Sequence, residues 1–129
     1  AFLLNRSSDL DSYVLFLSKE ITKYGIGGIF PTLVTDSVKN TKHAIWVIKE
    51  AAKLQTPDMA KILGIHLEGI FLNPEKKGIH NLVHFLKPTV ENYRLLEDDF
   101  IKIVTMAPEL DEGLIEYLKS KGGTVLVEI

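Results

Sequence analysis

The sequence predicts an α/β fold in which helices alternate with parallel strands. Three observations lead to this prediction. Short apolar runs of strand length recur along the chain, near residues 26–34, 61–67, 100–106 and 124–129. Segments with apolar residues at helical spacing lie before and between these runs, and glycine, proline and aspartate separate the two kinds of segment. Such alternation builds right-handed βαβ units and a parallel sheet.

The first helix is predicted over residues 8–24. Ser8 and Asp11 resemble a capping box at its start. Apolar residues then recur every three or four positions until Gly25, which is typical of a helix end.

The next two elements are a buried strand over residues 26–34 and a helix over residues 37–54. Pro31 interrupts the strand, so its later part is expected to leave the hydrogen-bond ladder. The helix follows three candidate capping residues, Thr35, Asp36 and Ser37. Its apolar stripe includes Ile45 and Ile48, and Trp46 is expected to join them in the core.

A second strand is predicted over residues 61–67, before a long loop over residues 70–88. The loop has no clean apolar period and carries Asn73, Pro74 and Gly78. One turn of helix is the most regular structure expected within it. Loops of this length in compact domains are usually functional or disordered.

The last part of the chain predicts a helix over residues 89–96, a strand over 100–106 and a helix that Asp111 caps. Gly122 and Gly123 end that helix. A fourth strand, with alternating apolar residues, occupies residues 124–129.

The length is consistent with two architectures. A complete (β/α)8 barrel needs about 250 residues, and this chain has 129, so it fits about half of such a barrel or a small open doubly wound sheet. The last apolar strand has no covering helix after it, which would leave an unpaired edge. We therefore expect residues 1–129 to be a single segment of a larger barrel, with no second domain.

Composition excludes several classes of function. There are 15 Lys+Arg and 17 Asp+Glu residues, giving a formal charge of -2, which argues against a nucleic-acid partner that needs a basic surface. No apolar stretch is long enough to span a membrane, and the first residues lack the pattern of a signal peptide. The chain has no cysteine, which excludes disulfides and thiolate ligands and is compatible with the cytoplasm.

The first candidate for chemistry is the pair His66 and Glu68. Alternation along a strand turns both side chains to the same face, at the strand end where parallel sheets carry their sites. A carboxylate there can bind a divalent metal or transfer a proton. The alternative is a solvated strand-end glutamate beside a hydrogen-bonded core histidine.

The second candidate is the segment of residues 75–80, Glu-Lys-Lys-Gly-Ile-His. Its cations and the imidazole of His80 suit an anionic, hydroxyl-rich ligand such as a sugar phosphate. An ordinary charged surface loop is the alternative. The third candidate is Glu109, which could reach the same mouth as Glu68, although a role at the following helix N-terminus is favoured.

Four segments taken in order resemble N-acetylglucosamine-6-phosphate deacetylase, a family of the amidohydrolase superfamily. They are GGIFPTLVT at residues 27–35, GIHLEGIF at 64–71, KKGIHN at 76–81 and TMAPE at 105–109. The order and the spacing carry the resemblance more than any single motif, and it covers essentially the whole chain.

The resemblance implies a fold and an activity. It implies a (β/α)8 barrel and a hydrolase that converts N-acetylglucosamine-6-phosphate to glucosamine-6-phosphate and acetate. By the same resemblance, Glu68 matches a ligand of a divalent metal ion, zinc or iron, and Ile79 and His80 match the pair that contacts the sugar. The resemblance also implies a homodimer.

Some features of the family pattern differ or are missing. Members usually have proline where this chain has Ile70 and a small residue where it has Ile79. The catalytic aspartate and the other metal ligands are not in this chain, which resembles approximately the second to fifth strands of the barrel. We therefore expect the 129-residue segment alone to be inactive, because zinc normally needs three or more protein ligands.

Two other functions stay open. One is a related amidohydrolase that acts on another N-acetylated sugar phosphate, such as N-acetylgalactosamine-6-phosphate. The other is a non-catalytic α/β module that binds a sugar phosphate through the loop around Lys76, Lys77 and His80.

Overall fold

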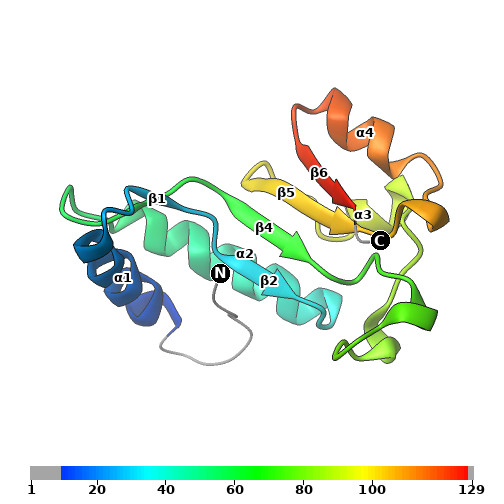
Figure 1. Ribbon diagram of the computed structural model, residues 1–129, viewed down its shortest axis with the longest axis horizontal. Coiled ribbons are helices and arrows are strands. Elements are labelled where there is room, and N and C mark those ends of the chain that lie inside the picture. Colours follow the sequence, from blue (N-terminus) through cyan, green and yellow to red (C-terminus); the bar gives the residue numbers. More distant parts are fainter. Residues whose placement is uncertain (1–9, 128–129) are drawn as a thin grey trace.

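The computed structural model describes residues 10–127, which form alternating helices and strands (Figure 1). The α-helices are α1 (Leu10–Glu20), α2 (Val38–Lys53), α3 (Val90–Arg94) and α4 (Leu114–Ser120). The strands are β1 (Gly28–Ile29), β2 (Thr32–Val34), β3 (Lys61–Ile62), β4 (Ile65–Glu68), β5 (Ile101–Met106) and β6 (Thr124–Val127). Short 3₁₀ helices are η1 (Ile21–Tyr24), η2 (Pro74–Lys76), η3 (Leu82–His84) and η4 (Pro108–Leu110).

The main sheet has the order β2-β4-β5-β6, and every pairing in it is parallel. β1 and β3 form a second, two-stranded parallel sheet. Helices alternate with the strands along the chain (Figure 1), and buried side chains of α2 share one hydrophobic cluster with those of β2 and β4. The predicted fold class, alternating β/α units with parallel strands, is confirmed.

Two predicted strands are each divided into two. Pro31 lies between β1 and β2, where the predicted strand over residues 26–34 leaves its first ladder. Gly64 separates β3 from β4, and a side chain there would overlap Lys102 and the carbonyl oxygen of Phe100. The close approach of β5 at Gly64 explains this break, which the apolar pattern of residues 61–67 did not reveal.

α2 matches the helix predicted over residues 37–54, and the packing of one residue differs from the prediction. Ser37 is the N-cap, and its side chain accepts a hydrogen bond from the Asn40 N–H at 3.1 Å. Ile45 and Ile48 are buried, as expected. The prediction for Trp46 is wrong, because its side chain is 59% exposed and stacks on His43.

The other predicted helices are shorter than expected or differ at their starts. The predicted helix over residues 8–24 is α1 followed by η1, and Ser8 lies outside the described residues. Asp111 is not the cap of α4, which begins after Gly113, although the Asp111 carboxylate accepts a hydrogen bond from the Ile115 N–H at 3.1 Å. Within residues 10–127, no helix has the length and apolarity needed to cross a bilayer.

The two faces of the main sheet differ in character. Leu33, Leu67 and Val104 are buried in a single hydrophobic core that also contains side chains of the helices. The alternation of β4 turns His66 and Glu68 to the opposite face, where both are half-buried. This second face therefore carries the polar groups that the sequence singled out.

Candidate functional site

Glu68 occupies the carboxyl end of β4, an inner strand of the main sheet. It lies in register with Val34 of β2 and Thr105 of β5. Its carboxylate is half-buried and makes no hydrogen bond or ion pair with another described residue. A carboxylate in this position can offer its oxygens to an external cation or proton donor.

His66 does not act as a second free group beside Glu68. Its Nδ1 lies 3.2 Å from the Thr32 hydroxyl, and its Nε2 lies 2.8 Å from the Thr105 hydroxyl. Burial lowers the pKa of the His66 imidazole, and the Glu68 carboxylate opposes that shift. Both ring nitrogens are engaged between neighbouring strands, so this histidine matches the structural alternative considered from the sequence.

The loop over residues 70–88 begins with an unusual backbone. Gly69 has a φ of 132° and Ile70 a φ of 65°. Positive φ is rare for a β-branched residue and marks a conformation that the surrounding contacts must stabilise. The Ile70 side chain is fully buried, and its N–H donates to the Thr35 hydroxyl at 3.0 Å.

The two ends of this loop are tied to each other. The Leu86 N–H donates to the Ile70 carbonyl oxygen at 2.9 Å. The Ala107 N–H donates to the Phe71 carbonyl oxygen, also at 2.9 Å, and so links the loop to the end of β5. The loop contains two 3₁₀ turns, η2 and η3, where the sequence predicted one turn of helix.

Ile79 and His80 lie in the middle of this loop and have different environments. The Ile79 side chain is 93% exposed. His80 is half-buried, and its Nδ1 lies 2.8 Å from the hydroxyl of Thr35, the residue that follows β2. Because Val34 is the register partner of Glu68, this contact brings His80 to the strand-end side of the sheet that carries Glu68. The sequence had placed Thr35 among the candidate helix caps and at the end of the first motif, without a contact to His80.

Glu109 lies in the first turn of η4 and also contacts the loop that follows β4. Its carboxylate accepts a hydrogen bond from the Asn73 side-chain amide at 2.8 Å and faces Lys76 at 3.9 Å. The hydrogen bond from Asn73 holds the pKa of the Glu109 carboxyl below its ordinary value. Lys76, expected at a ligand site, is therefore paired with a carboxylate of the neighbouring loop.

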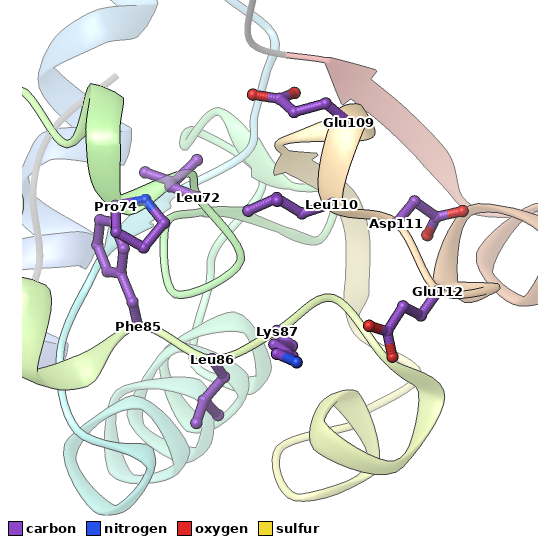
Figure 2. A pocket seen from close by; sticks show the side chains of 9 residues that line it. All are labelled: Leu72, Pro74, Phe85, Leu86, Lys87, Glu109, Leu110, Asp111 and Glu112. Atoms are coloured by element: carbon purple, nitrogen blue, oxygen red, sulfur yellow. The ribbon is translucent and has the colours of Figure 1, made fainter.

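A cavity of about 520 Å³ opens between the loops that follow β4 and β5 (Figure 2). Leu72, Phe85 and Leu110 give it apolar walls, and Lys87 and Glu112 stand at its edge. Neither Glu68 nor His80 lines this cavity. The cavity is thus separate from Glu68 and His80, whereas Glu109, the third candidate from the sequence, is one of its lining residues.

The described residues do not form a complete metal site. No three histidine, aspartate or glutamate side chains among them come together in a group that could hold a metal ion. Glu68 has the chemistry of a metal ligand, and its carboxylate pairs with no other described residue, whereas both nitrogens of His66 are already engaged. Within residues 10–127, Glu68 is thus a single carboxylate with no second metal ligand beside it.

Sequence comparison finds relatives along nearly the whole chain. N-acetylglucosamine-6-phosphate deacetylase of Danio rerio is 35% identical over 133 residues, which cover 94% of this chain and 31% of that protein. The chain is homologous to part of N-acetylglucosamine-6-phosphate deacetylase. It spans about a third of the length of the relatives it matches. The resemblance carried by the four ordered motifs is therefore confirmed, although no family model matches the chain.

Solved structures agree with this assignment. The deacetylase from Pasteurella multocida superposes with a TM-score of 0.72 at 29% identity, covering 92% of this chain and 32% of its own. The deacetylase from Thermotoga maritima shares the fold, with a TM-score of 0.75 at 21% identity over 97% of this chain and 34% of its own. N-acetylgalactosamine-6-phosphate deacetylase of a Shewanella species is 32% identical over 67% of this chain.

Proposed function

We propose that the protein carrying this chain is a metal-dependent hydrolase that removes the acetyl group from N-acetylglucosamine-6-phosphate. Homology along the chain supports the reaction, and one observation supports the site: the Glu68 carboxylate lies at the carboxyl end of an inner strand and makes no hydrogen bond or ion pair with another residue of the described range 10–127. In this reaction water adds across the amide. The C–N bond breaks, the acetyl carbon gains the hydroxyl group as acetate, and the nitrogen gains a proton as the free amine.

The chain supplies two parts of the proposed site. Glu68 serves as one ligand of a divalent ion, for which zinc and iron are the leading candidates, and the other ligands come from outside the described residues. Such an ion supplies Lewis-acid polarisation of the acetamide and activation of water when it is bound. Ile79 and His80 contact the sugar phosphate, and an exposed Ile79 beside a half-buried His80 is consistent with that role. The catalytic aspartate lies outside this chain.

The strands β2, β4, β5 and β6 are proposed as four consecutive strands of a (β/α)8 barrel. Their parallel order supports this reading, and so do the solved deacetylases, of which the chain covers about a third. A cytoplasmic location and a homodimeric state belong to the same proposal. Size-exclusion chromatography with light scattering of the protein that carries this chain tests the homodimer.

The experiment that tests the function measures acetate release from N-acetylglucosamine-6-phosphate, with the metal content determined on the same sample. The Glu68→Gln variant is expected to lose nearly all activity and to bind less metal, because the amide lacks the charge of a ligand. Glu75→Gln is the matched control, since Glu75 lies on the exposed η2 turn of the loop that follows β4. Absence of metal-dependent acetate release from the unmodified protein would reject the assignment.

The same experiment separates the two alternatives. N-acetylgalactosamine-6-phosphate is assayed in parallel, because a relative with that name is also similar to this chain. A preference for the galacto epimer would favour the related amidohydrolase. Binding of sugar phosphate without turnover, unchanged by Glu68→Gln, would instead identify a non-catalytic module.

A further inference from the structure

The hydroxyl of Thr35 makes contacts with two parts of the loop that follows β4. It accepts a hydrogen bond from the Ile70 N–H at 3.0 Å, where the loop begins. It also lies 2.8 Å from Nδ1 of His80, which is 45 residues away in the sequence. One hydroxyl group thus joins the end of β2, the start of the loop and the candidate substrate-contacting histidine.

The close approach of Gly69 makes this arrangement specific. A methyl group on Gly69 would overlap both the hydroxyl and the backbone nitrogen of Thr35. Only glycine leaves room for Thr35 at this point, and the positive φ of Gly69 also suits glycine. The position of the Thr35 hydroxyl is therefore determined by packed backbone as well as by its two hydrogen-bond partners.

The hydrogen-bond network favours one proton position on His80. A threonine hydroxyl has one proton to donate, and its oxygen can accept two hydrogen bonds, one of which comes from Ile70; the hydroxyl proton itself still needs an acceptor. Among the described residues, Nδ1 of His80 is the acceptor within reach of that proton. Donation by Thr35 requires Nδ1 to be unprotonated, so the neutral imidazole carries its proton on Nε2.

The remaining contacts of His80 leave Nε2 available. Nε2 has no hydrogen-bond partner among the described residues, and the ring also rests against Phe85, with centroids 6.3 Å apart. His66 provides the contrast, because threonine hydroxyls engage both of its ring nitrogens. His80 is thus held at one nitrogen and presents the other as a donor.

We infer that Thr35 is a positioning residue that fixes His80 in the Nε2–H tautomer and orients it to donate a hydrogen bond to an oxygen of the bound ligand. The nature of that ligand, a sugar phosphate, rests on the proposed function. The tautomer and its dependence on Thr35 do not, because they follow from contacts within this chain.

The direct test is ¹⁵N NMR of the protein that carries this chain, with histidine labelled in the ring. His80→Gln identifies the His80 signals by their loss. In the unmodified protein at a pH where the ring is neutral, we expect Nε2 to be protonated and Nδ1 to be bare. Thr35→Ser should keep this tautomer, and Thr35→Val should produce a mixture. A ring protonated at Nδ1 in the unmodified protein would overturn the inference, whether or not the protein is active.

Kinetics on N-acetylglucosamine-6-phosphate provide the second test. Thr35→Val should raise KM roughly tenfold with little change in kcat, since a hydrogen bond that orients a binding group affects ground state and transition state alike. Thr35→Ser should stay close to the unmodified protein. Thr41→Val is the matched control, because the Thr41 hydroxyl is buried in α2 and does not contact His80.

A double-mutant cycle separates positioning from general support of the fold. Thr35→Val should have little further effect on KM in a His80→Gln background, because the group through which it acts is gone. An equal effect in both backgrounds would overturn the inference. If the protein shows no deacetylase activity, the proposed function fails while the NMR measurement still decides the role of Thr35.

Discussion

The side-chain amide of Asn73 donates to the Glu109 carboxylate at 2.8 Å and so joins the loops that follow β4 and β5. The Lys76 ammonium lies 3.9 Å from the same carboxylate oxygen, Oε1. This hydrogen bond is the main reason that the pKa of Glu109 is below its ordinary value. The contact is exposed to solvent, so its effect is local to the two loops.

Removal of the Asn73 side chain should raise the pKa of Glu109. In Asn73→Ala, we expect the pKa of Glu109 to rise towards its ordinary value, as measured by NMR titration of the glutamate carboxyls. A lowered pKa in the folded state means that the contact stabilises the fold above the ordinary pKa and is lost as the pH falls through the folded-state value. The hydrogen-exchange protection factors of residues 73–77, which correct for the pH dependence of intrinsic exchange, should therefore fall on acidification. Asn81→Ala is the control, since Asn81 caps η3 and does not touch Glu109.

A side chain at position 69 should be poorly tolerated. Gly69→Ala places a methyl group against Thr35 at a positive φ, and we expect it to lower the free energy of unfolding by about 2 kcal/mol or more. Urea unfolding measures the change. Gly27→Ala is the matched control, because nothing lies within 4 Å of a methyl group there. If the two variants had the same free energy of unfolding, the close contact between Gly69 and Thr35 would be contradicted.

Proline at position 70 should also destabilise the protein, although members of the family that the sequence resembles usually have proline there. Ile70 has a φ of 65° and donates its N–H to Thr35, and proline can adopt neither that φ nor that role. Ile70→Pro should therefore cost about 3 kcal/mol or more in unfolding experiments. Ile70→Val, which keeps the backbone donor, should cost about 1 kcal/mol. A proline variant as stable as the valine variant would contradict this backbone.

Replacement of Thr41 by valine should increase stability. The Thr41 hydroxyl is buried and has no hydrogen-bond partner among the described residues. Its removal relieves the cost of an unsatisfied polar group, so we expect a gain of about 1 kcal/mol in thermal or urea unfolding. Thr105→Val should instead lower the free energy of unfolding, because it removes the hydroxyl that contacts Nε2 of His66. A loss of stability in Thr41→Val would indicate that the hydroxyl is satisfied.

The sequence was sufficient where local pattern determines structure. The strand predicted over residues 100–106 is β5, and the helix predicted over residues 37–54 is α2, because apolar spacing and a serine cap act within a few residues. Trp46 was misplaced because its stripe neighbours are buried while its own position faces solvent. The presence of apolar residues next to one another in the sequence does not show which of them faces the core.

The candidate site was less accessible to sequence reasoning. Glu68 could be located at a strand end from alternation alone, and the structure agrees. The contact between Thr35 and His80 could not, because it depends on how the loop over residues 70–88 closes over the end of β2. The partners of Glu109 were missed for the same reason, since Asn73 lies 36 residues earlier.

The hydrogen bond between Leu86 and Ile70 closes the ends of that loop independently of what lies between them. The entropic cost of lengthening a loop with fixed ends is small, about 0.6 kcal/mol for each doubling of its length. Insertions or deletions around η2 and η3 can therefore accumulate over evolutionary time while the sheet and Glu68 stay in place. A change of length within residues 72–85 should therefore disturb the fold less than a change in the strand that carries the proposed metal ligand.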